Sequence, residues 1–256
     1  MEQVDKTRNA ENDIPYLRVF AERLIELADD LTRNPSFSED DHFGFMILCY
    51  LSKQKTHLRS ILTLGDSRDS GIIARAMLES MCQLLWAATD PDNLALRWRS
   101  YSWILDLRKM KSRIAAGELV DKQRCNEIER AVQEYGHLHL MSKSEKKFDP
   151  YHKDWTGRTF RDLTTDVGAE QLYSTVYRSF SDWQHSSPAG MASALKRSNS
   201  SVTFVTKSHS VAATALAVGF QALIQSLEVA NNHLLLCADA RIVTLRNEYI
   251  DWAPIR

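Results

Sequence analysis

Glycine and proline are scarce in this chain, whose 256 residues include 9 glycines and 6 prolines. An all-β protein needs many tight turns, in which these two residues predominate, so the sequence argues against sandwiches and barrels. Cysteine is scarce as well, and the four cysteines are too widely spaced to form a paired metal or redox motif. We therefore expect reduced thiols in a cytoplasmic protein.

An excess of charge is also missing. The formal net charge is −1, so any attraction to nucleic acid has to come from a local patch. The chain has no glycine-rich phosphate loop, no nucleophile elbow and no EF-hand pattern. Residues 1–13 are polar and lack the apolar core of a signal peptide. His137 and His139 are two residues apart and point to different sides of a helix, so we expect no metal site and no cofactor.

One stretch, between Lys207 and Glu228, has no charged residue and is about as long as a bilayer requires. It is rich in alanine and is interrupted by several polar residues, including His209, Gln221 and Gln225. These polar groups fit the central helix of a bundle better than a membrane span. We therefore expect no membrane partner.

The spacing of apolar residues predicts a succession of long helices, with leucine and phenylalanine recurring every three or four positions. We expect a single all-α domain over 1–256, a bundle of about seven to eight helices, with an irregular region at 142–168. Residues 201–206 are rich in β-branched side chains and could be extended. The expected helices cover 12–34, 38–65, 67–89, 91–116, 120–140, 168–185, 209–237 and 240–249, and the irregular region holds a short helical candidate at 159–166.

The most informative candidates for chemistry are Arg178 and His185, near the end of one predicted helix. They are seven residues apart, which places them about two turns apart on nearly the same face of an α-helix. A guanidinium and an imidazole in this arrangement can bind a phosphate and move a proton beside it. Asp182 lies between them and could orient either. The same residues could equally form an ordinary polar stripe.

A second group surrounds Arg75 and Glu79, which are one turn apart in a helix that is apolar almost all the way round. Two charges there are costly unless they pair or bind something. One interpretation is a buried ion pair that fixes how helices meet. The other is a polar pocket, to which Tyr177 and Ser181 contribute, that orients other groups such as His185.

A possible basic surface lies on the helix predicted for 91–116. Arg97, Trp98 and Arg99 are followed by Arg108, and cations interleaved with aromatic rings can hold phosphates while stacking bases. Helices with a solvated basic face and a packed aromatic face are nevertheless common in proteins that bind no nucleic acid. These four residues are candidate RNA contacts, and the alternative is an ordinary solvated face of the helix.

Several short motifs occur together in an order that resembles a known family. They are Arg75-Ala-Met-Leu-Glu79, Trp155-Thr-Gly157 with Phe160-Arg161-Asp162, Tyr173-Ser-Thr-Val-Tyr177, and Ser181 through His185-Ser-Ser-Pro. Together they are similar to the bacterial helical proteins grouped as domain of unknown function 5677. The resemblance covers most of the chain, but the family brings no defined activity.

A more distant similarity suggests a reaction. Arg178 followed by His185 resembles the signature of HEPN domains (higher eukaryotes and prokaryotes nucleotide-binding), helical bundles that often dimerise. They include metal-independent RNases of toxin and antiphage systems. The resemblance implies that His185 is a general acid or base and that Arg178 stabilises charge on the scissile phosphate. Ser179 departs from the signature, which usually has Asn, Asp or His directly after the arginine, and so does the Ser-Ser-Pro that follows His185.

The sequence thus leaves three classes of function open. The first is a metal-independent endoribonuclease acting on RNA in a toxin or phage-defence setting, as a homo-oligomer and with an antitoxin or defence partner. The second is a non-catalytic helical module for binding or oligomerisation, in which the Arg75, Glu79 and His185 cluster is structural. The third is an enzyme that acts on an undefined small molecule.

Overall fold

The computed structural model describes residues 9–253 apart from Asn34, Ser36, 143–148 and 199–200. The N-terminal residues 1–8, the expected helix end at Asn34 and part of the expected irregular region therefore lie outside the described residues. The elements follow in the order α1 (Ala10–Leu31), α2 (His42–Leu64), α3 (Ser70–Ala87), α4 (Pro91–Ala115), α5 (Lys122–Tyr135), η1 (Gly136–His139), α6 (Phe160–Asp166), α7 (Glu170–Leu172), η2 (Tyr173–Tyr177), α8 (Arg178–Gln184), α9 (Pro188–Ala192), β1 (Leu195–Ser198), β2 (Ser201–Phe204), α10 (His209–Leu234) and α11 (Asp239–Trp252).

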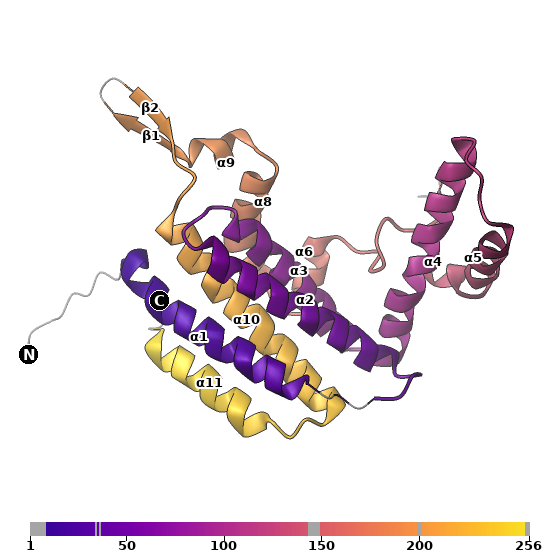
Figure 1. Ribbon diagram of the computed structural model, residues 1–256, viewed down its shortest axis with the longest axis horizontal. Coiled ribbons are helices and arrows are strands. Elements are labelled where there is room, and N and C mark those ends of the chain that lie inside the picture. Colours follow the sequence, from indigo (N-terminus) through magenta and orange to yellow (C-terminus); the bar gives the residue numbers. More distant parts are fainter. Residues whose placement is uncertain (1–8, 34, 36, 143–148, 199–200, 254–256) are drawn as a thin grey trace, which may run out of the picture.

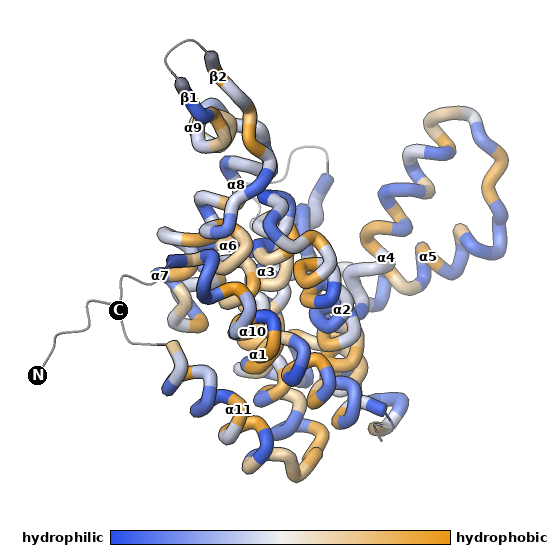
Figure 2. Tube along the Cα trace, turned by 60° about the vertical axis from the view of Figure 1, so that its left-hand side comes forward, coloured by the Kyte–Doolittle hydropathy of each residue, from blue (hydrophilic) through white to orange (hydrophobic). Residues whose placement is uncertain are grey.

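The body of the molecule is a bundle in which α10 packs against α1, α2 and α3 (Figure 1). Small side chains let these helices approach closely. At Gly219 an added Cβ would lie 2.8 Å from a methyl carbon of Leu58, so only glycine fits between α10 and α2 without a rearrangement. Along α1 and α11, hydrophobic and hydrophilic residues alternate as expected for helices with one buried side (Figure 2). The all-α prediction is confirmed.

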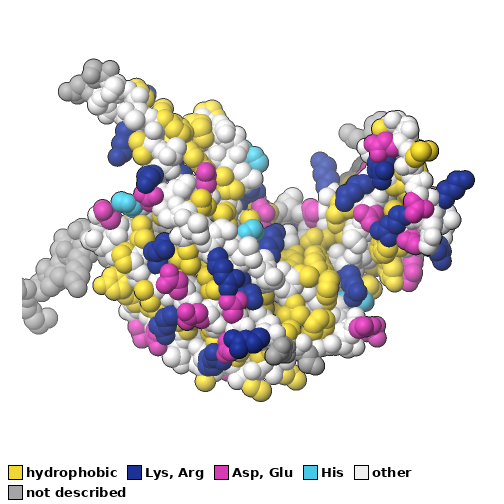
Figure 3. Space-filling view, in the orientation of Figure 1, with side chains coloured by type: hydrophobic (Ala, Val, Ile, Leu, Met, Phe, Trp, Pro, Cys, Tyr) yellow, Lys and Arg dark blue, Asp and Glu magenta, His cyan; other side chains and the backbone are white. Residues whose placement is uncertain are grey.

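An arm made of α4 and α5 projects from this body (Figure 1). Its own small core consists of Leu107, Met110 and Ile128, which are nearly inaccessible to solvent. The structure divides the helix expected over 120–140 into α5 and the 3₁₀ turn η1. Hydrophobic side chains lie on the face of the body beside the arm, where the surface is hollowed (Figure 3).

The chain from α6 to β2 forms short elements, of which α6, η2 and α8 contact α3. The short helix expected over 159–166 forms as α6, and the Thr159 side chain caps it. The helix expected over 168–185 is divided into α7, the single π-helical turn η2 and α8. Residues 201–204 are extended as expected and pair with β1, a strand that was not predicted. The short helices α6, α7 and α9 raise the helix count of the described residues above the expected seven to eight.

Helix α10 is the one helix of the described residues that is long and apolar enough to cross a bilayer. More than half of its apolar stretch is buried inside the bundle, where α10 contacts α1, α2, α3 and α11. One polar residue of this stretch, Ser226, has a partner inside the bundle. Its hydroxyl accepts a hydrogen bond of 2.9 Å from the buried side chain of Gln54.

Protonation of His139 is expected to make the fold sensitive to acid. The side chain is fully buried, its Nε2 lies 3.0 Å from the Ser100 hydroxyl, and its Nδ1 has no partner among the described residues. Burial, aided by the nearby Arg97 cation, lowers the pKa of His139 to about 4. Because the unfolded chain protonates near pH 6.5, stability should fall between pH 6.5 and 4, by about 2 kcal/mol from pH 7 to pH 5.

Urea unfolding at pH 7 and pH 5 measures this loss. The variant His139→Asn should show a smaller difference between the two pH values than the parent protein. The exposed His137, two residues earlier, is the control: His137→Asn should keep the full difference. Equal pH dependence in the parent and in His139→Asn would show that the acid sensitivity arises elsewhere.

Candidate functional site

Three residues of α8 and its C-terminal cap, identified as candidates from the sequence, lie on the solvent-facing side of the helix. Arg178, Asp182 and His185 are exposed, whereas Phe180 is 5 % exposed and faces α3. This division follows from helix geometry. Residues four and seven positions apart lie on the same side of an α-helix, and position 180 lies on the opposite side. His185 is the C-cap of α8, and its backbone N–H donates to the Ser181 carbonyl at 3.0 Å.

The side chains of Arg178 and His185 have no hydrogen-bond or ion-pair partner among the described residues. Asp182 is different: its carboxylate accepts a hydrogen bond of 3.0 Å from the Ser187 hydroxyl, the N-cap of α9. Asp182 therefore stabilises the turn between α8 and α9, and its expected role in orienting Arg178 or His185 stays a prediction. The first two side chains remain available to a ligand.

The expected pair of Arg75 and Glu79 forms, with 2.8 Å between Nη2 and Oε1. Arg75 also donates to the Tyr177 hydroxyl at 2.6 Å and to the Gln184 side chain, and its guanidinium lies 4.5 Å from the centre of the Tyr177 ring. The Tyr177 hydroxyl in turn donates to Glu79 at 2.8 Å. We call these four residues the Arg75 cluster.

The Arg75 cluster joins α3 to both ends of α8, through Tyr177 before it and Gln184 at its end. Burial raises the pKa of the Tyr177 hydroxyl, and its hydrogen bond to Glu79 raises it further, so the phenol keeps the proton that it donates. The cluster thus positions the backbone on which His185 lies. The sequence identified Tyr177 as a member but missed Gln184. The Ser181 hydroxyl makes no hydrogen bond with any described residue.

A second set of contacts holds α8 at its C-terminal end. The indole N–H of Trp183 donates to Asp69 at 3.0 Å, and the Arg68 guanidinium lies 5.5 Å from the Trp183 ring. At Gly71 an added Cβ would lie 2.7 Å from a ring carbon of Phe180, so this ring packs directly on the backbone of α3. Helix α8 is therefore fixed along its whole buried side.

The wide turn η2 precedes α8. Here the backbone N–H of Arg178 donates to the carbonyl of Tyr173, five residues earlier. Such π-helical turns are rare and often occur at functional sites. The rings of Tyr173 and Tyr177 stack across the turn with 5.4 Å between their centres, and Phe160 of α6 lies 4.3 Å from Tyr177.

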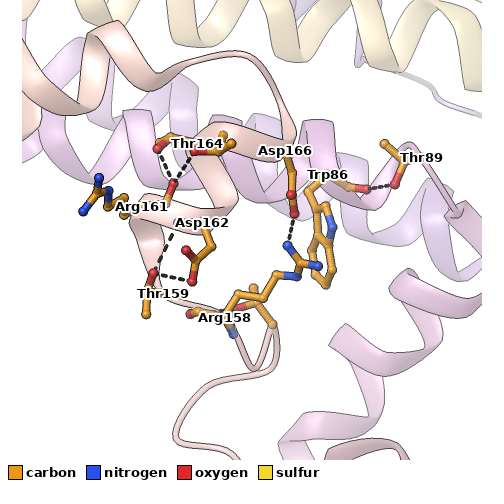
Figure 4. A network of polar contacts seen from close by, with 10 residues as sticks. Trp86, Thr89, Arg158, Thr159, Arg161, Asp162, Thr164 and Asp166 are labelled. Carbon is orange, nitrogen blue, oxygen red and sulfur yellow. Dashed lines mark hydrogen bonds and ion pairs between the residues drawn. The ribbon is translucent and has the colours of Figure 1, made fainter.

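An open pocket of about 720 Å³ lies between α6 and the segment from α7 to Arg178. Arg161 and Arg178 contribute to its wall, together with Glu170 and Tyr173. Figure 4 shows that Arg161 points out from α6 on the side away from Asp166, with which Arg158 forms an ion pair. Arg161 is a functional candidate that the sequence analysis missed, although it lies in the Phe160-Arg161-Asp162 motif.

The cations of α4 are largely engaged within the molecule. Arg108 donates to Asp149 at 2.6 Å and to the Tyr101 hydroxyl at 2.8 Å. It also donates to the backbone carbonyls of Tyr151 and His152, in the loop that follows η1. Arg99 lies 2.9 Å from a ring nitrogen of His42. These contacts connect the arm to its loop and to the body.

Arg97 and Trp98 are half-buried. An added Cβ at Gly157 would lie 2.7 Å from the Arg97 guanidinium, and Trp98 packs against the rings of Phe45 and Tyr50. The structure does not gather the four α4 residues into one free cationic surface. Their proposed contact with RNA stays a prediction.

Within the described ranges, no group of three or more His, Cys, Asp or Glu side chains is placed to hold a metal ion. His139 is buried against Ser100, and His137 is exposed. The two histidines of this segment thus do not point into a common site.

Comparison with known proteins identifies a family. A model for a family of unknown function, DUF5677, matches residues 45–202, well over half of the chain. The matched region runs from α2 to β2 and includes both the Arg75 cluster and α8. No curated protein and no solved structure matches the chain significantly.

Proposed function

The chain belongs to the DUF5677 family, whose function is unknown, and we propose from the geometry of α8 that it is a metal-independent endoribonuclease. The observation that supports this best is the side of α8 that carries Arg178 and His185. Both side chains are exposed and without partners among the described residues, on a helix that the Arg75 cluster and Phe180 fix in place. Preorganised groups of this kind favour catalysis, because little reordering is needed when the substrate binds.

The proposed reaction is attack of a ribose 2′-oxygen on the adjacent phosphorus. The bond between the 2′-oxygen and phosphorus forms while the bond from phosphorus to the 5′-oxygen breaks, which leaves a 2′,3′-cyclic phosphate and a 5′-hydroxyl. His185 takes the proton from the 2′-hydroxyl or supplies one to the leaving oxygen. Arg178 stabilises the charge that develops on the phosphate.

One histidine performs one of the two proton transfers in a single step. A second copy of the chain, facing the first, would supply the other from its own His185. A homodimer is therefore part of the proposal, as are a cytoplasmic location, a toxin or phage-defence setting and an antitoxin or defence partner. These last elements come from the similarity to HEPN domains.

Cleavage of single-stranded RNA by the purified protein tests this function. We expect cleavage in the presence of EDTA, with 2′,3′-cyclic phosphate ends. A DNA strand of the same sequence should stay intact because it lacks the 2′-hydroxyl that attacks. Cleavage that requires a metal ion, cleavage of the DNA strand, or no cleavage of any RNA would each contradict the proposal.

A non-catalytic binding module is the second candidate, and one feature favours it. A groove of about 900 Å³ separates the body from the arm, and Phe37, Phe45 and Trp103 contribute apolar surface to its wall. Such a groove suits a protein segment better than RNA, because Glu127 and Glu134 also border it. Binding of a partner protein without RNA cleavage would support this candidate.

A further inference from the structure

The pocket beside Arg178 has the charge that a phosphodiester requires. Arg161 and Arg178 line it, and neither guanidinium has a hydrogen-bond or ion-pair partner among the residues that the structure describes. Glu170 also lines it and offsets one of the two positive charges. The resulting charge of about +1 matches the single negative charge of one phosphodiester better than the several charges of a nucleoside triphosphate.

The same pocket also offers an aromatic ring. Tyr173 forms part of its wall and stacks on Tyr177, which the Arg75 cluster holds through its hydroxyl. Phe160 supports the pair from α6. A ring fixed in this way provides a rigid surface on which a nucleobase can stack.

Arg178 connects this pocket to the proposed site of cleavage. It lies in the pocket wall and is also the first residue of α8, the helix that His185 caps at the other end. A phosphate bound by Arg178 can therefore belong to the strand whose neighbouring nucleotide enters the pocket.

We propose that this pocket binds the nucleotide that flanks the scissile phosphate in a single strand of RNA. Arg161 holds the flanking phosphate, and Tyr173 stacks on the base, which has to leave a duplex to reach it. The substrate is therefore single-stranded at this position. This inference rests on the proposed ribonuclease function and assigns Arg161 and Tyr173 to substrate binding.

Binding of an uncleavable strand separates this proposal from catalysis. The probe is a fluorescently labelled 2′-O-methyl RNA decamer, whose blocked 2′-oxygens cannot attack. Relative to the parent, Arg161→Ala and Tyr173→Leu should each weaken binding by about 5- to 100-fold. Arg161→Ala should also reduce the slope of log K against log salt by about 1, because one phosphate contact is lost, whereas Tyr173→Leu should leave the slope unchanged.

Two control variants remove similar side chains elsewhere: Arg130→Ala on α5 and Tyr16→Leu on α1, both exposed. They should bind like the parent. The same decamer in a duplex should bind equally to the parent and to Tyr173→Leu. Pocket variants that behave like the controls would overturn the nucleotide pocket, even if the parent cleaves RNA. Pocket-dependent binding by a protein that cleaves no RNA would instead refute the ribonuclease function and leave a single-strand binding pocket.

Discussion

Replacing His185 with alanine is expected to reduce RNA cleavage by a factor of about 10² to 10⁴, the usual contribution of a general acid or base. The effect should fall on the chemical step, because the imidazole transfers a proton and the strand is held by other groups. His185 is exposed and has no side-chain partner among the described residues, so the variant should keep the thermal stability of the parent.

Single-turnover cleavage of labelled single-stranded RNA measures this effect, with circular dichroism to confirm folding. The control is His137→Ala, which removes an exposed imidazole from η1 and should cleave at the parent's rate. In cells, expression of the parent should slow growth and degrade RNA, whereas His185→Ala should do neither. A folded His185→Ala protein that cleaves as fast as the parent would remove His185 from the mechanism.

Replacing Phe180 with alanine is expected to have a comparable effect through structure. The ring is 5 % exposed and lies directly on the α3 backbone at Gly71, so its loss leaves a cavity at the centre of the contact between α8 and α3. Truncation of a buried phenylalanine typically costs about 3–5 kcal/mol. A short helix held by few neighbours should open locally under such a loss.

Hydrogen exchange distinguishes local opening from global unfolding. In Phe180→Ala the amides of residues 178–184 should exchange much faster, while those of α2 and α10 stay protected, and RNA cleavage should be lost. The control Tyr16→Ala truncates an exposed ring on α1 and should leave protection of α8 and cleavage nearly unchanged. Unchanged protection of α8 in Phe180→Ala would show that the polar contacts alone hold the helix.

Local patterns in the sequence predicted the helices and the shared side of Arg178 and His185. These features depend on spacing along one segment, and the burial of Phe180 opposite them follows from the same geometry. Pairing of Arg75 with Glu79 was predictable for the same reason, since the two residues are one turn apart.

Contacts between distant segments were not predictable in this way. The partners of Arg108 include Asp149 and the His152 carbonyl, more than forty residues later, so its engagement could not be read from the charge pattern of α4. Likewise, Arg161 could not be identified from the sequence, because its proximity to Arg178 at one pocket depends on how α6 packs. The π-helical turn also escaped prediction, because no residue type specifies it.

The branching contacts of Arg75 have a consequence for how this protein can evolve. One planar guanidinium serves Glu79, Tyr177 and Gln184 together, and a lysine ammonium, as a compact point charge, cannot reproduce that fork. A lineage that altered any of these positions alone would tilt the helix that carries His185. We therefore expect the four positions to have been inherited as a unit, with exchanges at one of them accompanied by compensating exchanges at the others.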